Sequence, residues 1–437
     1  MSLPVQSISS SRRIALVDGN NFYCSCERVF QPKLNGHPLI VLSNNDGCAV
    51  SRSQEAKDLG VKMGQPLFKI PAEIKRQGLI ALSSNYALYA DLSNRMMHLL
   101  GEVTPAQEVY SIDESFIDLS HLTHARSLDA SYALRAKILQ WIGIPVCAGI
   151  GPSKTLAKLA NHVAKKNLLP DLAGVFSWES LTPTSADAVL ARIPVSEVWG
   201  VGRRLTDGLE AMNIRTALDL KRADRRTIAK RFSVVLGRTV DELNGHACLS
   251  LDEVVPGKQQ IMTSRSFAQT VTNIDALASA IARFASRGAE KLRQQGSMAN
   301  AVQVFAQTNR FADEPQYNPS LTVPLSMATD DTLRITRAAL FGLKHFFRPE
   351  FAYKKAGVML TGLEQRTGHQ GDLFSRFDEA KSASLMAAMD ALNSKYGQDT
   401  IRLAITTGKI SKASAMRRER KSPNYTTRWD EIPMAVC

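Results

Sequence analysis

The sequence predicts an α+β protein of several domains, and three observations support this prediction. The chain has 437 residues, of which 44% are hydrophobic and 22% charged, which is enough to bury a sizeable core in about three domains. Strand-like and helical patterns mix as far as about residue 178. A helical stretch follows, and a second mixture of strands and helices begins near residue 258.

The first mixture opens with a buried strand. The apolar run 14–17 leads into Asp18, and 39–42 is a second strand-like run. Helix-forming residues follow a serine cap within 51–59, and apolar residues recur at helical spacing over 85–100. Both patterns predict helices.

A hairpin is expected next. In 108–120, EVYSIDESFIDLS, two β-rich halves flank Asp113 and Glu114, which places these acids at the bend. A helix, a strand and a helix then complete the first mixture over 128–142, 145–150 and 153–166.

The second half begins with helical, basic sequence over 181–246. The stretch 249–257, which contains Pro256 and Gly257, fits a tether. Strands are expected over 260–271, 299–308 and 355–360, with helices near 274–295 and 331–345. From residue 364 onward the chain is mostly polar and basic.

The charge balance points to an anionic partner. Lys and Arg number 54 against 41 Asp and Glu, so the net charge is +13, and such proteins meet nucleic acid or anionic membranes more often than average. No apolar stretch is long enough to span a membrane, and the N-terminus lacks a signal-peptide pattern, so a soluble, unexported protein is expected. Six scattered cysteines and eight histidines form neither a disulfide scaffold nor a zinc motif, which favours the reducing cytosol.

Three acids form the strongest candidate site. Asp18, Asp113 and Glu114 each stand at the end or bend of a strand-like run in one predicted sheet. Carboxylates suit Mg²⁺, and three of them could hold two ions about 3.5 to 4 Å apart for phosphoryl transfer. The alternative is that Asp-Gly is an ordinary turn and that adjacent acids face water.

Two glycine-rich stretches lack known phosphate motifs. The stretch 149–155, GIGPSKT, lacks P-loop spacing, and Gly200 and Gly202 are not followed by a third glycine at 205. The helix after Gly151 nevertheless offers amides and lysines to a phosphate, or is a solvated basic face. Its lysines are Lys154, Lys158, Lys165 and Lys166.

Five motifs occur in order along the chain. They are DGNNFYCSCE (18–27), SRSQEAKDLGVKMG (51–64), SSNYALYADLSNR (83–95), SIDESFIDL (111–119) and GIGPSKTLAKLANHVAKK (149–166). Together they resemble the Y-family translesion DNA polymerases, and the likeness covers nearly the whole chain. Two further stretches, NNDGCAVSRSQEAK and SPNYTTRWDEIP (422–433), strengthen it.

The resemblance implies a polymerase shaped like a right hand. It would have a ferredoxin-like palm, small fingers, a helical thumb with a helix-hairpin-helix, and an α+β little finger. The corresponding ranges are palm 1–25 and 75–178, fingers 26–74, thumb 179–250, linker 251–259, little finger 260–363, and basic C-terminal tail 364–437 with a clamp-binding peptide.

The family's metal-binding carboxylates match Asp18, Asp113 and Glu114, which implies two Mg²⁺ ions. Tyr23, beside Phe22, matches the aromatic that excludes a 2′-hydroxyl; the alternative is a half-buried structural ring. The positions that contact the incoming triphosphate are Ser51, Gln54, Lys57 and Lys165.

Two of these positions depart from the commoner family pattern. Many members have tyrosine where Gln54 stands and arginine where Lys57 stands. Because lysine is a point charge rather than a bidentate fork, the departure bears on how tightly nucleotide is held. The alternative for Lys57 and Lys165 is surface solvation.

The resemblance also implies contacts with DNA and protein. The glycine hairpin would present amides to phosphates, with arginines adding positive charge, although a solvated helix would also be basic. The DNA-binding positions are Gly200, Gly202, Arg203, Arg204 and Arg265. A clamp-binding peptide would use Gln370, Leu373 and Phe374, and the basic run 409–428 would engage DNA or a UmuD′-like dimer. RecA is a further implied partner.

The implied activity is error-prone, template-directed translesion DNA synthesis in the SOS response. Nucleotidyl transfer would run from a deoxynucleoside triphosphate to a primer 3′-hydroxyl, in the cytoplasm and at the nucleoid. Two alternatives stay open: another two-metal palm enzyme such as a nucleotide cyclase, and a catalytically weak DNA-binding scaffold of a translesion complex that needs partner subunits.

Overall fold

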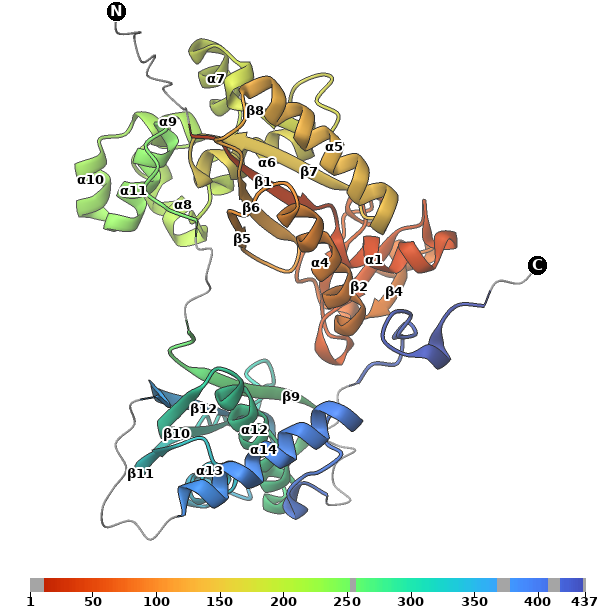
Figure 1. Cartoon of the computed structure of the whole chain (residues 1–437), viewed down its shortest axis with the longest axis vertical. Coiled ribbons are helices and arrows are strands. Elements are labelled where there is room, and N and C mark those ends of the chain that lie inside the picture. Colours follow the sequence, from red (N-terminus) through yellow and green to blue (C-terminus); the bar gives the residue numbers. More distant parts are fainter. Residues whose placement is uncertain (1–11, 252–256, 368–377, 408–416, 435–437) are drawn as a thin grey trace, which may run out of the picture. The chain divides into compact units, whose positions relative to one another are not determined.

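The computed structural model describes residues 12–251, 257–367, 378–407 and 417–434. The chain divides into two compact units (Figure 1). Unit 1 comprises residues 1–255 together with 419–437, and unit 2 comprises residues 256–418. The chain therefore leaves unit 1, forms unit 2 and returns to unit 1 at its C-terminal end.

Unit 1 is built on a five-stranded sheet with strand order β5-β6-β1-β7-β8. Every neighbouring pair is antiparallel except the parallel pair β7–β8. The strands are β1 (Ile14–Gly19), β5 (Gln107–Val109), β6 (Glu114–Asp118), β7 (Val146–Gly151) and β8 (Val175–Ser177). The predicted strand, hairpin and strand are all confirmed.

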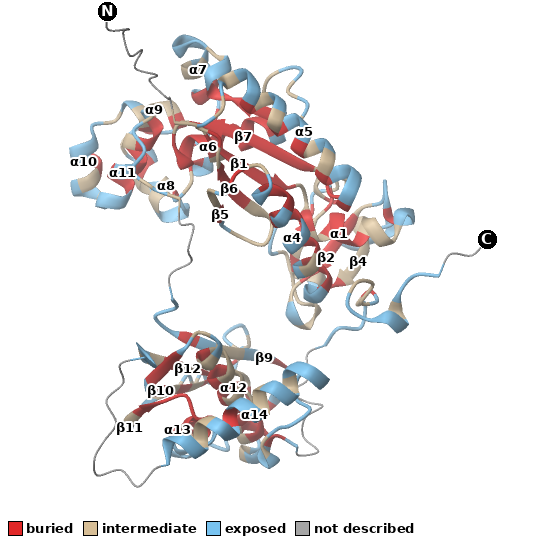
Figure 2. Cartoon of the chain, in the orientation of Figure 1, coloured by how far each residue is buried: buried red, intermediate tan, exposed pale blue. Residues whose placement is uncertain are grey.

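Helices cover both faces of this sheet because its strands are apolar on both sides. Ala15 and Val17 pack toward α4 (Tyr86–Gly101) and α5 (His124–Ile142), while Ile14 and Leu16 pack toward the opposite side with α6 (Lys154–Lys166). Figure 2 shows β1 and β7 as almost entirely buried. The predicted helices over these three ranges are confirmed.

A smaller, three-stranded sheet of order β3-β2-β4 lies beside α1 (Phe22–Phe30). Its predicted helix begins at Gln54 rather than nearer Ser51, because Ser51 belongs to β3 and the Ser53 side chain caps the helix by accepting from the Ala56 amide. The elements are β2 (Leu39–Leu42), β3 (Ala49–Arg52), α2 (Gln54–Asp58), α3 (Ala72–Arg76) and β4 (Ile80–Ser83), with 3₁₀ turns η1 (Pro32–Leu34), η2 (Asn44–Asp46) and η3 (Leu67–Lys69).

The predicted helical stretch after residue 181 is confirmed. Its helices share an apolar core with α6, through residues such as Leu159 and Leu220. The elements are η4 (Trp178–Ser180), α7 (Pro183–Leu190), η5 (Val195–Glu197), α8 (Arg203–Glu210), α9 (Ala217–Arg222), α10 (Arg225–Arg231) and α11 (Val234–Leu243). The short turn η8 (Trp429–Glu431) closes unit 1.

Unit 2 is a four-stranded antiparallel sheet of order β11-β10-β12-β9, with two helices packed on one face. The strands are β9 (Ile261–Val271), β10 (Ser297–Thr308), β11 (Ser320–Thr329) and β12 (Tyr353–Gln365); the helices are α12 (Ile274–Gln294), α13 (Thr332–Phe346) and α14 (Glu379–Tyr396), with η6 (Ala404–Thr406). Three of the strands and both core helices match the sequence prediction, whereas β11 and α14 were not expected.

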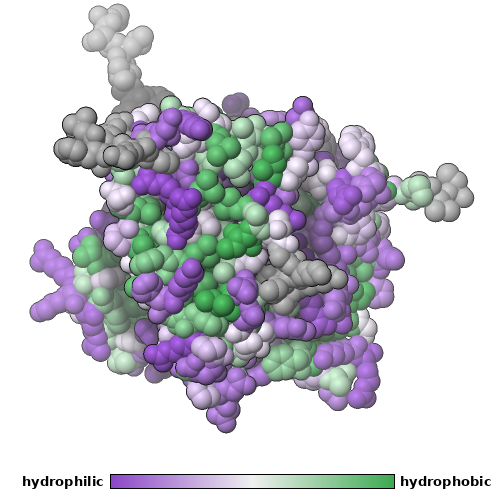
Figure 3. All heavy atoms as spheres, turned by 90° about the horizontal axis from the view of Figure 1, so that it is seen from below, coloured by the Kyte–Doolittle hydropathy of each residue, from purple (hydrophilic) through white to green (hydrophobic). Residues whose placement is uncertain are grey.

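The surface of unit 2 mixes apolar and charged side chains. Several apolar residues of α13 and α14 are exposed, namely Leu333, Phe341, Leu385, Leu392 and Tyr396. Figure 3 shows hydrophobic patches bordered by hydrophilic side chains on one face of the molecule. No described helix combines the length and apolar character that crossing a bilayer requires.

Candidate active site

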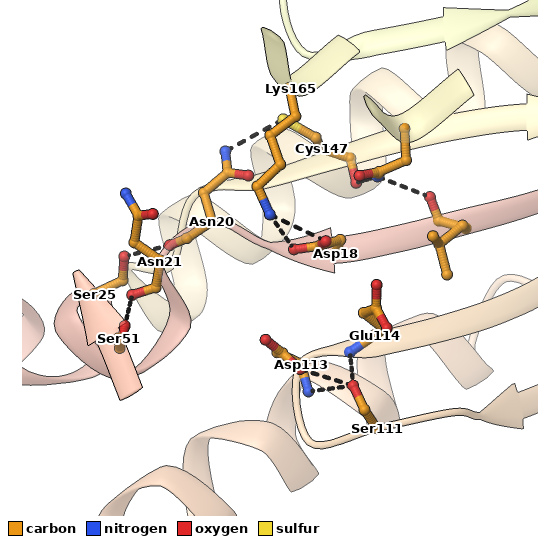
Figure 4. Close-up of polar contacts among 12 residues, drawn as sticks. Asp18, Asn20, Asn21, Ser25, Ser51, Ser111, Asp113, Glu114, Cys147 and Lys165 are labelled. Atoms are coloured by element: carbon orange, nitrogen blue, oxygen red, sulfur yellow. Dashed lines mark hydrogen bonds and ion pairs between the residues drawn. The ribbon is translucent and has the colours of Figure 1, made fainter. Parts of the chain in front are cut away.

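The three predicted acids meet at one edge of the unit 1 sheet. Asp18, near the end of β1, lies directly opposite Glu114, the first residue of β6. The Gly19 amide donates to the Asp113 carbonyl at 2.8 Å, which holds the hairpin bend against the end of β1. Strand pairing therefore brings together acids that are almost one hundred positions apart in the sequence (Figure 4).

Each of these carboxylates already has a polar partner. Lys165 Nζ lies 2.8 and 3.0 Å from the two Asp18 oxygens, and Lys158 Nζ lies 3.1 and 3.2 Å from those of Glu114. Asp113 Oδ1 accepts a 2.7 Å hydrogen bond from Ser111 Oγ. Two ammonium groups thus balance two of the three carboxylates, in the place where a metal ion would otherwise supply positive charge.

Both lysines come from α6, which lies directly on β7 because that strand carries glycines. A Cβ at Gly149 would lie 1.9 Å from the Asn161 amide nitrogen, and one at Gly151 would lie 2.8 Å from that of Ala157. Asn161 also donates to the Leu16 and Cys147 carbonyls. The glycine-rich stretch therefore serves close helix packing, which a comparison with phosphate motifs alone did not reveal.

Asp18 is a buried carboxyl group with a shifted pKa. Burial is the largest cause and raises the pKa of Asp18 from 3.8 to about 6, with smaller contributions from the negative charges of Glu114 and Asp113. The ammonium of Lys165 opposes the rise without cancelling it. The site thus holds a carboxylate that is costly to ionise without a stronger cation.

Lys158 sits among aromatic rings contributed by distant segments. Its Nζ lies 4.2 Å from the ring centroid of Tyr110, 5.3 Å from that of Trp199 and 5.9 Å from that of Phe116. Ring faces attract ammonium groups at such distances. The rings come from the hairpin and from the loop before α8, so no spacing rule in the sequence could have grouped them with this lysine.

The donor chemistry of the three acids fits a divalent metal ion. Mg²⁺ takes oxygen ligands and usually only one or two protein carboxylates, with water and substrate completing its shell. Within the described ranges no three His, Cys, Asp or Glu side chains stand as a finished ligand cluster. Asp18 and Glu114 are instead each paired with an ammonium group.

Tyr23 and Phe22 open α1 immediately after the β1 edge. Phe22 is buried and lies so close to Gly19 that a Cβ there would be 2.8 Å from its ring. Tyr23 is half-buried, and its ring stacks on Tyr89 of α4 at 4.5 Å with an interplanar angle of 16°. Tyr86 meets Tyr23 edge-on at 6.1 Å.

Two of the predicted triphosphate residues meet at the start of α1. Ser51 Oγ donates to the Asn21 carbonyl at 3.3 Å, and Lys57 Nζ donates to the Asn21 side-chain oxygen. Burial, followed by the positive charges of Lys165 and other basic neighbours, lowers the pKa of Lys57. Gln54 is exposed instead and donates to Asp58 at 2.7 Å. Lys57 and Lys165 thus share a basic region next to the acids.

The predicted DNA contacts are exposed. Gly200 has φ +88°, which favours glycine, and Gly202 is the N-cap of α8, so no capping side chain bonds the amides at the start of this helix. Arg203 and Arg204 follow directly and are exposed. The loop before α8 is tied to the loop between β5 and β6 through Trp199 Nε1, which donates to Tyr110 Oη at 3.2 Å.

The two remaining predicted contacts lie elsewhere. Arg265 is in unit 2, where it lines a cavity of about 290 Å³ together with Arg283 and Arg287 of α12. Burial and neighbouring guanidinium groups lower the pKa of Arg265. The predicted clamp peptide, with Gln370, Leu373 and Phe374, lies outside the described residues.

Family models match three parts of the chain. Residues 17–162 match the impB/mucB/samB family, and residues 258–373 match the C-terminal domain of the same family. Residues 383–435 match a domain of unknown function. The first two ranges cover the acid site and most of unit 2.

Whole-chain relatives agree with the family models. Protein UmuC of Salmonella typhimurium is 44% identical over 429 residues, covering 96% of this chain and 99% of that protein. Protein ImpB of the same species is 43% identical over 425 residues, with the same coverage. DNA polymerase IV of Bacillus velezensis is 28% identical over 409 residues, covering 90% and 92% of the two chains.

Solved structures share the fold. A Y-family DNA polymerase chimera of Dbh and Dpo4 superposes with a TM-score of 0.63 at 18% identity, covering 81% of this chain and 99% of the chimera. The fold and the acid edge define the class of Y-family DNA polymerases. Within that class, the chain belongs to the impB/mucB/samB family. The expected resemblance and the expected α+β fold are both confirmed.

Proposed function

We propose that this chain is an error-prone translesion DNA polymerase that transfers a nucleotide from a deoxynucleoside triphosphate to a primer 3′-hydroxyl on a DNA template. The observation that carries this proposal is the meeting of Asp18, Asp113 and Glu114 at one edge of a central sheet. Relatives named UmuC and DNA polymerase IV, similar over nearly their full length, support the class of reaction.

Polymerases of this family are metal-dependent, and we propose Mg²⁺ as the metal and two as the number of ions. Asp18, Asp113 and Glu114 would hold it. When bound, the ions would lower the pKa of the primer hydroxyl and neutralise charge on the leaving pyrophosphate. Lys165 and Lys158 would release their carboxylates in that state, which leaves the Lys165 ammonium free to contact the triphosphate.

The residues around α1 would hold the nucleotide. Tyr23 would exclude a 2′-hydroxyl sterically, with Phe22 fixing the start of the helix. Ser51 and Lys57, which meet at Asn21, would contact the triphosphate together with Lys165. Gln54 remains in this role only as a proposal from the family pattern, since its side chain faces Asp58.

The remaining parts would bind DNA and partner proteins. Gly200, Gly202, Arg203 and Arg204 would hold the duplex by its phosphates, and Arg265 would add to the little finger's contact. We retain the assignment of palm (1–25, 75–178), fingers (26–74), thumb (179–250), linker (251–259), little finger (260–363) and tail (364–437). The sliding clamp, a UmuD′-like dimer and RecA are proposed partners, and the SOS response and the nucleoid the proposed setting.

Primer extension with Mg²⁺ on undamaged and abasic templates tests the proposal, with and without RecA and a UmuD′-like dimer. The double variant Asp113→Asn, Glu114→Gln should abolish extension while DNA binding survives, because these polar edge residues are not part of the apolar core. Normal extension by this variant would refute the metal assignment. An inactive wild-type chain that binds DNA under every condition would favour the scaffold alternative.

A further inference from the structure

The C-terminal segment 419–431 packs onto the catalytic unit. Lys421 forms a parallel bridge with Ser83 at the end of β4, the edge strand of the small sheet. The Ser83 amide donates to the Arg420 carbonyl at 3.0 Å, and the Arg420 amide donates to Ser83 Oγ at 3.0 Å. The segment therefore continues the small sheet by a short parallel pairing.

Two further contacts anchor this segment. Asn85, fully buried at the start of α4, donates through its side-chain amide to Ser422 Oγ at 3.0 Å and to the Pro423 carbonyl at 3.0 Å. The Tyr425 ring stacks on Phe30 of α1 at 4.8 Å, with an interplanar angle of 10°. Because both partners belong to the helices that flank the candidate nucleotide site, the segment bridges α1 and α4.

The C-terminal segment also contacts a buried carboxyl group. Glu27 of α1 is fully buried, and its Oε1 accepts hydrogen bonds from Ser422 Oγ at 3.0 Å and from Tyr89 Oη at 2.6 Å. Tyr89 is also fully buried, so its hydroxyl gains no compensation from water if this bond is lost. One oxygen atom thus links the C-terminal segment to the ring of Tyr89.

Tyr89 is in turn the ring on which Tyr23 stacks, at 4.5 Å. Because Glu27 fixes the hydroxyl end of Tyr89, the Tyr89 ring is held in place where Tyr23 stacks on it. A small displacement of a residue that contacts substrate can change a reaction rate strongly. We propose that the C-terminal segment, through Ser422, Glu27 and Tyr89, positions Tyr23 for sugar discrimination. This assigns a role to part of the region matched by the domain of unknown function.

The proposal rests on the proposed role of Tyr23 and makes Ser422, Glu27 and Tyr89 positioning residues. Its test is the ratio of kcat/KM for ribonucleotide over deoxynucleotide insertion by the full-length chain, assayed with RecA and a UmuD′-like dimer. This ratio is independent of the fraction of folded enzyme, so a loss of folded protein does not change it. Ser422→Ala and Tyr89→Phe should each raise it about three- to tenfold, the loss expected from one hydrogen bond.

Two control variants test whether the change in this ratio is specific to the Ser422 hydroxyl. Ser422→Thr keeps the hydroxyl and should keep the wild-type ratio. Trp429→Ala, in the same segment but with a side chain that is 91% exposed, should also leave the ratio unchanged. Equal increases in the Trp429→Ala variant would overturn the proposal, because they would show a nonspecific effect of altering the segment.

The Tyr23→Ala variant distinguishes failure of the proposed role of Tyr23 from failure of the proposed positioning role of the C-terminal segment. If it leaves the ratio unchanged, the role of Tyr23 fails, and this proposal fails with it. If it raises the ratio while Ser422→Ala and Tyr89→Phe match the wild type, the role of Tyr23 stands and the positioning role is overturned. In the expected case, adding Ser422→Ala to Tyr23→Ala produces no further increase, because both changes act on the same ring.

Discussion

At the scale of single residues, the site is built from groups that cost stability when no substrate is present. Asp18 is a buried acid near the end of the central strand β1, and even an ammonium group at 2.8 Å leaves its pKa raised to about 6. Such a group binds its proton more tightly in the folded chain than in the unfolded one. Burial of the Asp18 carboxyl group at this candidate metal site therefore lowers the stability of the folded chain when no cation is bound.

Asp18→Asn should therefore stabilise the metal-free protein at pH 7. Between pH 3.8 and about 6 the folded state holds more protons than the unfolded state, so the contribution of Asp18 becomes less favourable as pH rises through that window. The gain at pH 7 should be about 1 to 2 kcal/mol and should disappear near pH 4. Thermal unfolding at the two pH values, with chelator present, measures it; an equal gain at both would contradict the role of ionisation.

The sequence was sufficient to predict that the three acids lie close together, since each stands at the end or bend of a recognisable strand-like run and within a family motif. It was not sufficient for their partners. Lys158 was visible only as one of several helix lysines, and its aromatic neighbours come from separate segments. The link from Ser422 to Glu27 joins positions 395 residues apart, which no local pattern predicts.

At the scale of elements, the position of Lys158 and Lys165 beside the acids depends on how closely α6 approaches β7. Gly149→Ala should destabilise unit 1 by about 1 to 3 kcal/mol, because its Cβ would collide with the backbone of α6 rather than with a movable side chain. The midpoint of denaturant unfolding measures this. Gly202→Ala, where the space is open, is the matched control and should cost less, about 0.5 kcal/mol, because alanine is only a poorer N-cap than glycine. Equal midpoints for the two variants would disprove the packing role.

A second prediction at this scale concerns the two arginines at the start of α8. Arg203→Ala with Arg204→Ala should weaken binding to primer-template DNA by a similar factor for every sequence, because phosphate contacts carry no sequence information. The slope of log affinity against log salt should become shallower by about two, one for each lost contact. Fluorescence anisotropy titrations over a range of salt concentrations measure both quantities. A sequence-dependent loss would instead point to base contacts.

Most helices and strands could be predicted from the residues that form them, and the exceptions have physical reasons. The strand β11 contains Pro324 and borders only β10, so its apolar residues are half-buried and its signal is weak. Only Met386 of α14 is fully buried, and its other residues are exposed or half-buried, so its sequence resembles a solvated tail. Its place is set by contacts such as the ion pair between Arg293 and Asp390, which requires the folded unit 2.

At the scale of the whole molecule, the basic charge and the division into two units suit a protein that holds a long polyanion. The peptide QGDLF at 370–374 adds a proposed tether to the sliding clamp. Leu373→Ala with Phe374→Ala should raise the dissociation constant for the clamp at least tenfold, because two buried apolar anchors would be lost. Surface plasmon resonance with immobilised clamp measures this, and unchanged binding would remove the peptide from that role.

The return of residues 419–431 to unit 1 has a consequence for how the polymerase is made. The first 250 residues, including all three acids, are synthesised long before Ser422, and domains generally fold in order of synthesis. The nascent chain would thus contain the three acids while Ser422, the partner of Glu27, had still to be translated. If the proposed roles hold, products of premature termination before Ser422 would have the three acids but lack the hydrogen bond to Glu27 that positions Tyr89.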